Sequence, residues 1–219
     1  MITVLLVDDH DLVRMGIRRL LEDETGISIV GEANSGEQAL GLCRDLRPQV
    51  ILMDVKMPGI GGLEATRRLH ASHPETQVIA LTACGDDPFP GRLLRAGAAG
   101  YLTKGADVSE MVRAVKTVVR GERYLSPSIA QRLALKPFSG DQSDNPLDSL
   151  SEREMQITMM IVNCHRVQEI SDKLCLSPKT VNTYRYRIFE KLDIASDVEL
   201  THLALRHGLI EPDNAERAS

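Results

Sequence analysis

Five polar side chains of the kind that bind a metal ion or a phosphoryl group each follow a short apolar stretch of the chain. They are the carboxylates of Asp8, Asp9 and Asp54, the hydroxyl of Thr82 and the amine of Lys104. Crowded carboxylates repel one another unless a cation neutralises them, and oxygen ligands with open positions suit Mg²⁺. A carboxylate beside such an ion can attack phosphorus, while an amine and a hydroxyl stabilise the phosphoryl oxygens. The five residues therefore predict phosphoryl transfer to Asp54, provided that they meet in space.

The elements that would bring them together alternate between strand and helix patterns. Continuous apolar runs, typical of strands buried on both faces, occupy 2–7, 27–33, 50–53, 78–81 and 99–102. Helical patterns follow them at 12–21, 35–46, 63–72, 90–97 and 107–120. Five strands alternating with five helices predict an α/β fold with a parallel sheet covered on both faces. Function in such a sheet lies at the carboxyl ends of the strands, where the five polar residues stand.

This set of residues resembles the receiver domain of two-component response regulators, whose fold is the flavodoxin-like doubly wound sheet. The resemblance rests on Asp8-Asp9, Asp54 with Pro58-Gly59, Thr82-Ala83 and Lys104. It implies Mg²⁺ ligands at Asp8 (through water), Asp9, Asp54 and the backbone carbonyl of Lys56. It implies that Asp54 is the phosphoacceptor, that Thr82 and Lys104 hold the phosphoryl group, and that Tyr101 is an aromatic switch. The phosphodonor in this family is a sensor histidine kinase.

The region after Thr82 contains two prolines, Pro88 and Pro90. Because each proline disfavours helix in the residue before it, the fourth helix is expected to begin late, near Pro90, and to stop at Gly97. A helix of barely two turns is marginal without tertiary packing. We therefore predict that residues 83–95 form a mobile switch surface that shifts when phosphate binds.

The rest of the chain divides into a linker and a small helical domain. We predict a receiver at 1–121, a linker at 122–147 with a short helix from Ser126-Pro127, and a second domain at 148–212. Residues 137–146 are polar and turn-forming, which predicts a flexible tether. Four helices are expected behind the cap signals of the second domain. They begin at Ser151-Glu154, at residue 167, at Ser177-Pro178 and at Ser196-Glu199.

The third of these helices carries cations for phosphates, together with amides and hydroxyls for base edges. The candidates are Lys179, Thr180, Asn182, Thr183, Arg185, Tyr186, Arg187 and Lys191. A charged helix that follows another across a tight turn fits helix-turn-helix docking in the major groove of double-stranded DNA.

The second domain resembles the LuxR-type (NarL/FixJ) helix-turn-helix family. The pattern is Leu150-Ser151-x-Arg153-Glu154, Glu169-Ile170, Ser177 to Asn182 and Lys191-Leu192. The resemblance implies that Asn182, Thr183 and Tyr186 contact bases and that the other candidates contact the DNA backbone. It also implies that the last helix, about 197–207, pairs two copies as a homodimer on a two-fold site. Cys164 stands where the family often has glycine, and a non-glycine residue in that left-handed turn costs of order 1 kcal/mol.

Within this family, the runs 59–66, 98–102 and 183–187 resemble the GacA/UvrY branch. That resemblance implies a bacterial global regulator that activates promoters of small regulatory RNAs, with RNA polymerase as a further partner and no enzymatic turnover of its own.

The composition limits compartment and partners. A net charge of −5 does not suggest a nucleic-acid binder as a whole, but net charge averages over domains and is compatible with a local basic patch. The four cysteines form no CxxC pair, which favours reduced thiols over a disulfide framework or a zinc site. The apolar start, 1–7, is too short for a signal peptide or a membrane span, so we expect a cytoplasmic protein.

Two other functions stay open at this point. A metal-dependent aspartyl phosphatase would use Asp54 as a turnover nucleophile, but such enzymes usually carry a second acid two residues later, where this chain has Lys56. A regulator locked by a ligand or a partner would still bind its promoter and switch normally after Asp54→Asn.

Overall fold

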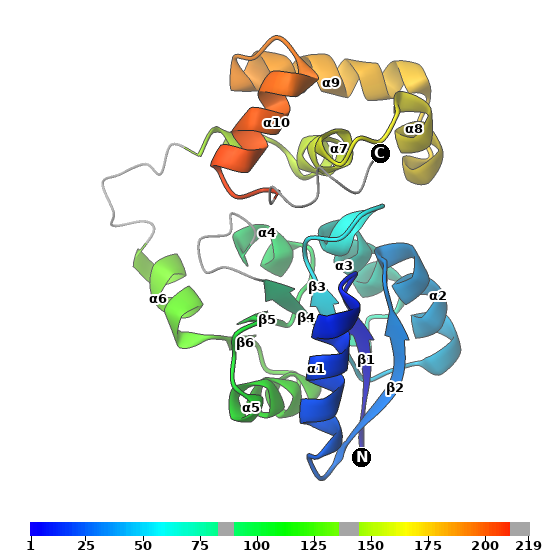
Figure 1. The fold of residues 1–219 in the computed structure, drawn as a ribbon, viewed down its shortest axis with the longest axis vertical. Helices are drawn as coiled ribbons and strands as arrows, with labels where there is room; N and C mark the ends of the chain where they lie inside the picture. Colours follow the sequence, from blue (N-terminus) through cyan, green and yellow to red (C-terminus); the bar gives the residue numbers. More distant parts are fainter. Residues whose placement is uncertain (83–89, 136–144, 211–219) are drawn as a thin grey trace. The chain divides into compact units, whose positions relative to one another are not determined.

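The computed structural model describes residues 1–82, 90–135 and 145–210. They form two compact units, one before the gap at 136–144 and one after it, and each unit is taken by itself (Figure 1). Residues 83–89 of the predicted switch surface and most of the predicted tether at 137–146 lie outside the described residues.

The first unit is built on a parallel sheet in the order β2-β1-β3-β4-β5-β6 (Figure 1). The strands are β1 (Ile2–Val7), β2 (Ile27–Ala33), β3 (Val50–Asp54), β4 (Gln77–Thr82), β5 (Gly100–Thr103) and β6 (Tyr124–Leu125). The predicted α/β sheet is confirmed, but the expected count of five strands was wrong. The sixth strand pairs Tyr124 with Gly100, and a run of two residues is too short to show strand periodicity.

Helices cover both faces of this sheet. They are α1 (Asp11–Glu22), α2 (Gly36–Leu46), α3 (Gly61–Ser72), α4 (Pro90–Arg95) and α5 (Val108–Val119). A further helix, α6 (Pro127–Leu135), follows β6 and contacts α4. Because side chains alternate along a strand, Leu52 packs with residues of α1 and α5, whereas Ile51 and Met53 pack with residues of α2 and α3. All three are fully buried, so β3 forms the centre of the core and its carboxyl end is rigidly placed.

Local signals set the ends of these helices. The Ser35 hydroxyl caps α2 by accepting from the N–H of Gln38, and the Asp107 carboxylate caps α5 by accepting from the N–H of Glu110. The short α4 begins at Pro90, as predicted, and Gly97 follows it with a φ of +102°. A Cβ at Gly97 would lie 2.2 Å from Cγ of His70, so glycine is needed there for space as well as for conformation.

The second unit is all-helical, as predicted. Its elements are η1 (Pro146–Ser149), α7 (Glu152–Val162), α8 (Val167–Leu174), α9 (Pro178–Leu192) and α10 (Asp197–Arg206). A full capping box between Ser151 and Glu154 begins α7, and the Ser177 hydroxyl caps α9. Cys164 has a φ of +62°, so the expected left-handed turn after α7 is made without glycine. None of the helices among the described residues is long and apolar enough to cross a membrane.

Candidate functional site

The strand order brings the predicted site residues of the first unit to one edge of the sheet. Strands β1, β3, β4 and β5 are neighbours, and Asp8, Asp54, Thr82 and Lys104 lie at or directly after their carboxyl ends. The Lys104 ammonium joins two of them, because its Nζ lies 2.7 Å from Oδ2 of Asp8 and 3.0 Å from Oδ2 of Asp54. Asp8 and Lys104, which lie far apart in the sequence, therefore meet in one cluster.

Burial gives this cluster unusual electrostatics. Asp8 and Asp54 are at most 2% exposed, and Thr82 is 1% exposed. Burial raises the pKa of Asp54, the Lys104 ammonium lowers it, and the Asp8 carboxylate raises it; the balance of these effects is a pKa of about 7. Burial lowers the pKa of Lys104, but the two carboxylates outweigh it and raise that pKa overall. The Asp54 pKa therefore stays raised despite the Lys104 ammonium, and a bound cation would lower it.

The backbone around Asp54 is held closely. The N–H of Lys56 donates to Oδ1 of Asp54 at 3.1 Å. The first turn of α3 packs on the end of β3, because a Cβ on Gly62 would lie only 2.0 Å from the carbonyl oxygen of Asp54. The intervening loop turns at Gly59, with a φ of +81°, and the Glu37 carboxylate accepts from the next N–H, that of Ile60, at 3.2 Å. The loop that carries the Lys56 carbonyl is therefore fixed by its neighbours.

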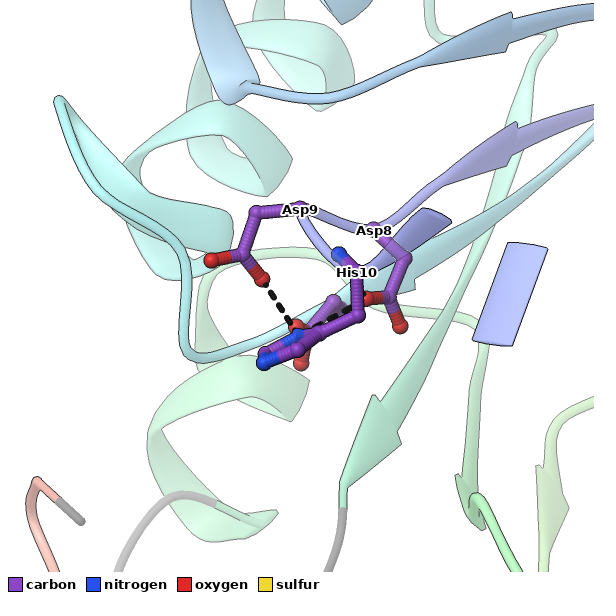
Figure 2. A group of neighbouring side chains, drawn as sticks. Asp8, Asp9 and His10 are labelled. Carbon is purple, nitrogen blue, oxygen red and sulfur yellow. Dashed lines mark hydrogen bonds and ion pairs between the residues drawn. The ribbon is translucent and has the colours of Figure 1, made fainter. Parts of the chain in front are cut away.

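The donor set beside Asp54 fits a divalent cation. One ligand atom each from Asp8, Asp9, His10 and Asp54 lies within 4.8 Å of the others. Carboxylate oxygens at such separations can surround one hard ion and leave positions for water. The sequence placed Asp8, Asp9 and Asp54 here but missed the imidazole of His10, which Figure 2 shows beside the two neighbouring carboxylates. The sequence hints only that His10 is unusual, because histidine is not a preferred N-cap residue, and it does not show where the ring points.

Tyr101, the predicted switch residue, lies in β5 opposite Ala80 of β4. Its side chain is fully buried. The structure therefore describes one position of this ring, packed inside the first unit.

In the second unit, α9 presents one face to solvent. The side chains of Lys179, Thr183, Tyr186 and Arg187 are exposed along it, and Asn182 is half-buried beside them. Positions three, four, seven and eight apart lie on the same side of a helix. The ring of Tyr186 is 72% exposed, which is unusual for a large aromatic side chain in a small domain.

Two predicted DNA-contact residues of α9 form ion pairs within the unit. Arg185 forms a two-bond ion pair with Asp197 of α10, with Nε to Oδ1 at 2.7 Å, and its guanidinium also lies over the ring of Phe189. Lys191 donates to Oε2 of Glu154 at 2.7 Å. Among the described residues, Lys179 and Arg187 form no ion pair, so their charges are the ones left to solvent.

Comparison with known families decides what the two units are. Residues 4–116 match the response regulator receiver domain, and residues 148–204 match the bacterial regulatory proteins of the luxR family. The chain is a response regulator of the LuxR family. It is therefore a DNA-binding transcription regulator and not an enzyme, which removes the aspartyl phosphatase from consideration.

Relatives of nearly full length support this assignment. Response regulator GacA of Pseudomonas aeruginosa is 65% identical, with 96% of this chain and 99% of that protein covered. Response regulator UvrY of Escherichia coli K12 is 55% identical, with 100% of this chain and 99% of that protein covered. The predicted GacA/UvrY branch of the NarL/FixJ-type regulators is thus confirmed.

Solved structures agree with the fold. A LuxR-family two-component response regulator from Aurantimonas sp. SI85-9A1 is 38% identical, with a TM-score of 0.59, and covers 63% of this chain and 98% of its own. RcsB of Salmonella enterica serovar Typhimurium, solved on promoter rprA with the phosphomimetic BeF3⁻, has a TM-score of 0.70. It is 23% identical and covers 93% of this chain and 98% of its own, so it supports the fold alone.

Proposed function

We propose that a sensor histidine kinase phosphorylates Asp54 and that the phosphoryl group changes how the LuxR-type unit binds promoter DNA. The main support for this proposal is the carboxylate of Asp54. It is buried at the carboxyl ends of the strands, with the Lys104 ammonium 3.0 Å from its Oδ2. As a phosphorus–oxygen bond to Asp54 forms, the phosphorus–nitrogen bond to the kinase histidine breaks. Lys104 and the Thr82 hydroxyl would hold the transferred group.

The metal that supports this transfer would be Mg²⁺, held by Asp8, Asp9, Asp54 and the backbone carbonyl of Lys56. The carboxylate donors fit it because oxygen ligands with room for water are what Mg²⁺ prefers. When bound, the ion neutralises charge on the phosphoryl oxygens. Lys104 balances the buried carboxylates from the other side, and the Lys56 N–H orients Oδ1 of Asp54.

The change at Asp54 would reach the rest of the receiver through Thr82 and Tyr101, the two switch residues, and through residues 83–95. Support for this comes from their positions, since Thr82 ends β4 and Tyr101 lies in the adjacent β5. A buried ring in a neighbouring strand can respond to movement of Thr82 only by repacking, because protein interiors are close-packed.

DNA would be recognised by side chains on the exposed face of α9. Asn182, Thr183 and Tyr186 would contact base edges, and Lys179, Thr180 and Arg187 would contact phosphates. Arg185 and Lys191 would contribute less charge to DNA, because Asp197 and Glu154 already pair with them.

The assembly on DNA would be a homodimer joined through α10. That helix leaves Val198 66% exposed and Leu205 38% exposed, as an interface helix would. Activation would require RNA polymerase as a further partner. The expected targets are promoters of small regulatory RNAs. The protein would act in the cytoplasm. The domain bounds 1–121, 122–147 and 148–212 belong to the same proposal.

The deciding experiment is a phosphotransfer assay with Mg²⁺ and a purified phosphodonor. Wild-type protein is expected to gain one phosphoryl group, and Asp54→Asn none, as resolved by mass spectrometry or a phosphate-affinity gel. Asp11→Asn is the matched control, because its carboxylate is 83% exposed at the start of α1 and should leave labelling unchanged. Phosphorylation of Asp54→Asn at the wild-type level would refute the site.

A promoter-binding assay at stated salt tests the consequence. Phosphorylation is expected to tighten wild-type binding and to leave Asp54→Asn unaffected. If Asp54→Asn still switches as the wild type does, the regulator is locked by a ligand or a partner rather than by phosphate.

Base reading has its own test in the same assay. Asn182→Ala should lose about 1–3 kcal/mol of discrimination at one base position, whereas Lys179→Ala should weaken all sequences equally. Equal effects of both variants on every sequence would contradict the assignment.

A further inference from the structure

His10 occupies the N-cap position of α1 without capping the helix. An N-cap side chain normally accepts a hydrogen bond from an N–H of the first turn, but His10 makes no such bond. Its Nδ1 instead lies 2.9 Å from Oδ1 of Asp9 and 3.3 Å from Oδ1 of Asp8. Figure 2 shows the ring turned toward both carboxylates. The side chain is therefore directed into the acidic cluster and not along the helix.

The backbone holds the imidazole in this place. The N–H of His10 donates to Oδ1 of Asp8 at 2.9 Å, so the residue is tied to the same carboxylate that its ring faces. Lys104 contacts the other oxygen, Oδ2, of Asp8. The His10 side chain is 43% exposed, whereas that of Asp8 is 2% exposed. The imidazole thus stands on the solvent side of the cluster, where an ion from solution would arrive.

We propose that His10 donates a nitrogen ligand to the divalent cation held by Asp8, Asp9 and Asp54, and that this pocket accordingly favours first-row transition ions over Mg²⁺. The proposal rests on the metal pocket of the proposed function and adds a ligand to it. The four ligand atoms lie within 4.8 Å of one another. Opposite ligands of one octahedral ion lie about 4.2 Å apart, so small side-chain movements would complete the site.

The selectivity follows from the donor atom. Mg²⁺ prefers oxygen ligands and gains little from imidazole, whereas the affinity of nitrogen-containing sites rises from Mn²⁺ toward Cu²⁺. Carboxylates alone would discriminate weakly between Mg²⁺ and Mn²⁺. A nitrogen ligand gives the pocket a preference that three carboxylates lack.

The test uses full-length protein and Mn²⁺ as the probe. Pulsed electron paramagnetic resonance is expected to show ¹⁴N coupled to the bound Mn²⁺ in the wild type, and the coupling is expected to vanish in His10→Asn. Titration should show Mn²⁺ affinity falling about tenfold in that variant, with Mg²⁺ affinity changing less than about twofold. Asparagine is a preferred N-cap residue, so the start of α1 is preserved.

His73→Asn is the matched control, because this histidine lies at the C-terminal end of α3 in the same unit. It should retain both the nitrogen coupling and the Mn²⁺ affinity. A wild-type spectrum without nitrogen coupling, or coupling that persists in His10→Asn, overturns the assignment of His10 while leaving the carboxylate pocket intact. Absence of both Mn²⁺ and Mg²⁺ binding by the wild type refutes the metal pocket itself and, with it, the metal requirement of the proposed function.

Discussion

The strand-end cluster of the receiver and the α9 helix of the LuxR-type unit use charge in opposite ways. At the strand ends, Asp8 and Asp54 are buried and share the ammonium of Lys104. On α9, Arg185 and Lys191 already have carboxylate partners in their own unit, while Lys179 and Arg187 face solvent.

This difference shows which charged groups remain available to bind a ligand. A buried carboxylate that lacks a full partner gains stability from a cation or a covalent phosphoryl group, so its site is poised to change state. A cation already paired within the fold instead supports the domain and offers less to DNA. The proposed phosphorylation thus lies at the strand ends, and the proposed DNA contacts lie on one exposed stripe of α9.

The largest expected effect concerns the backbone that holds Asp54. Gly62→Ala would place a Cβ 2.0 Å from the carbonyl oxygen of Asp54, and neither backbone can yield easily. We expect a loss of about 3 kcal/mol or more in the free energy of unfolding, together with impaired phosphorylation. The measurement is chemical denaturation of the receiver transition. Gly16→Ala, in α1 with no neighbour within 4 Å of its Cβ, should instead gain about 0.5–1 kcal/mol.

The next effect tests whether the strand-end charges are truly uncompensated. Burial and Asp8 raise the pKa of Asp54 to about 7 in the folded, metal-free receiver, against an ordinary value of 3.8 in the unfolded chain. Ionisation of this group therefore costs stability progressively as pH rises from about 4 to about 7. Asp54→Asn should stabilise the metal-free protein by up to about 4 kcal/mol near pH 8 and by much less near pH 4.

Thermal unfolding in a metal chelator across this pH range measures that difference. An unchanged difference between the two pH limits would show that Asp54 is well compensated by Lys104. The charges at the strand ends would then be as fully paired as Arg185 and Lys191 of α9.

A smaller loss is expected when a paired cation of α9 is removed. Lys191→Ala leaves the buried Glu154 carboxylate without its ammonium and should cost about 1–2 kcal/mol, less than for a fully buried pair because Lys191 is 42% exposed. Burial raises the pKa of Glu154, but the bonds from Lys191 and Ser151 outweigh this and lower it overall. The contribution is therefore present above the ordinary pKa of 4.5 and is lost as pH falls through the lower folded value.

Lys179→Ala is the matched control for this measurement. Its side chain is exposed, so it should change stability by less than about 0.5 kcal/mol. Equal losses of stability from Lys191→Ala and Lys179→Ala would mean that the Glu154 contact contributes nothing.

The smallest effect separates paired from unpaired cations on DNA. Lys179→Ala should reduce the slope of log affinity against log salt by about 1, since one phosphate contact is lost. Arg185→Ala should reduce it by less, because Asp197 already neutralises much of the Arg185 charge. Titration of promoter DNA at several salt concentrations measures both slopes. A larger change for Arg185 than for Lys179 would reverse the assignment of the two residues.

Much of the fold followed from local patterns. The cap at Ser35, the capping box at Ser151–Glu154 and the late start of α4 at Pro90 involve residues at most four positions apart, so the sequence displays them directly. The strand β6 did not follow, because two residues carry no period, and its pairing with Gly100 bridges more than 20 positions.

The candidate site divides in the same way. Asp8, Asp54, Thr82 and Lys104 could be placed together from sequence because parallel strands bring their carboxyl ends to one edge, whatever the intervening loops do. His10 could not, because whether an N-cap side chain faces its helix or a neighbouring carboxylate depends on three-dimensional packing.

By itself, the sequence determined five of the six strands, the helix caps and the candidate phosphoryl-binding residues, since each depends on short-range spacing or on strand ends sharing an edge. Only the tertiary structure decided which charged side chains are paired within the fold. The pairing of Lys191 with Glu154 spans 37 positions, and that of Arg185 with Asp197 joins two helices across a turn. A helix presents side chains around its whole circumference, so its periodicity alone does not show which of them a neighbouring helix will meet.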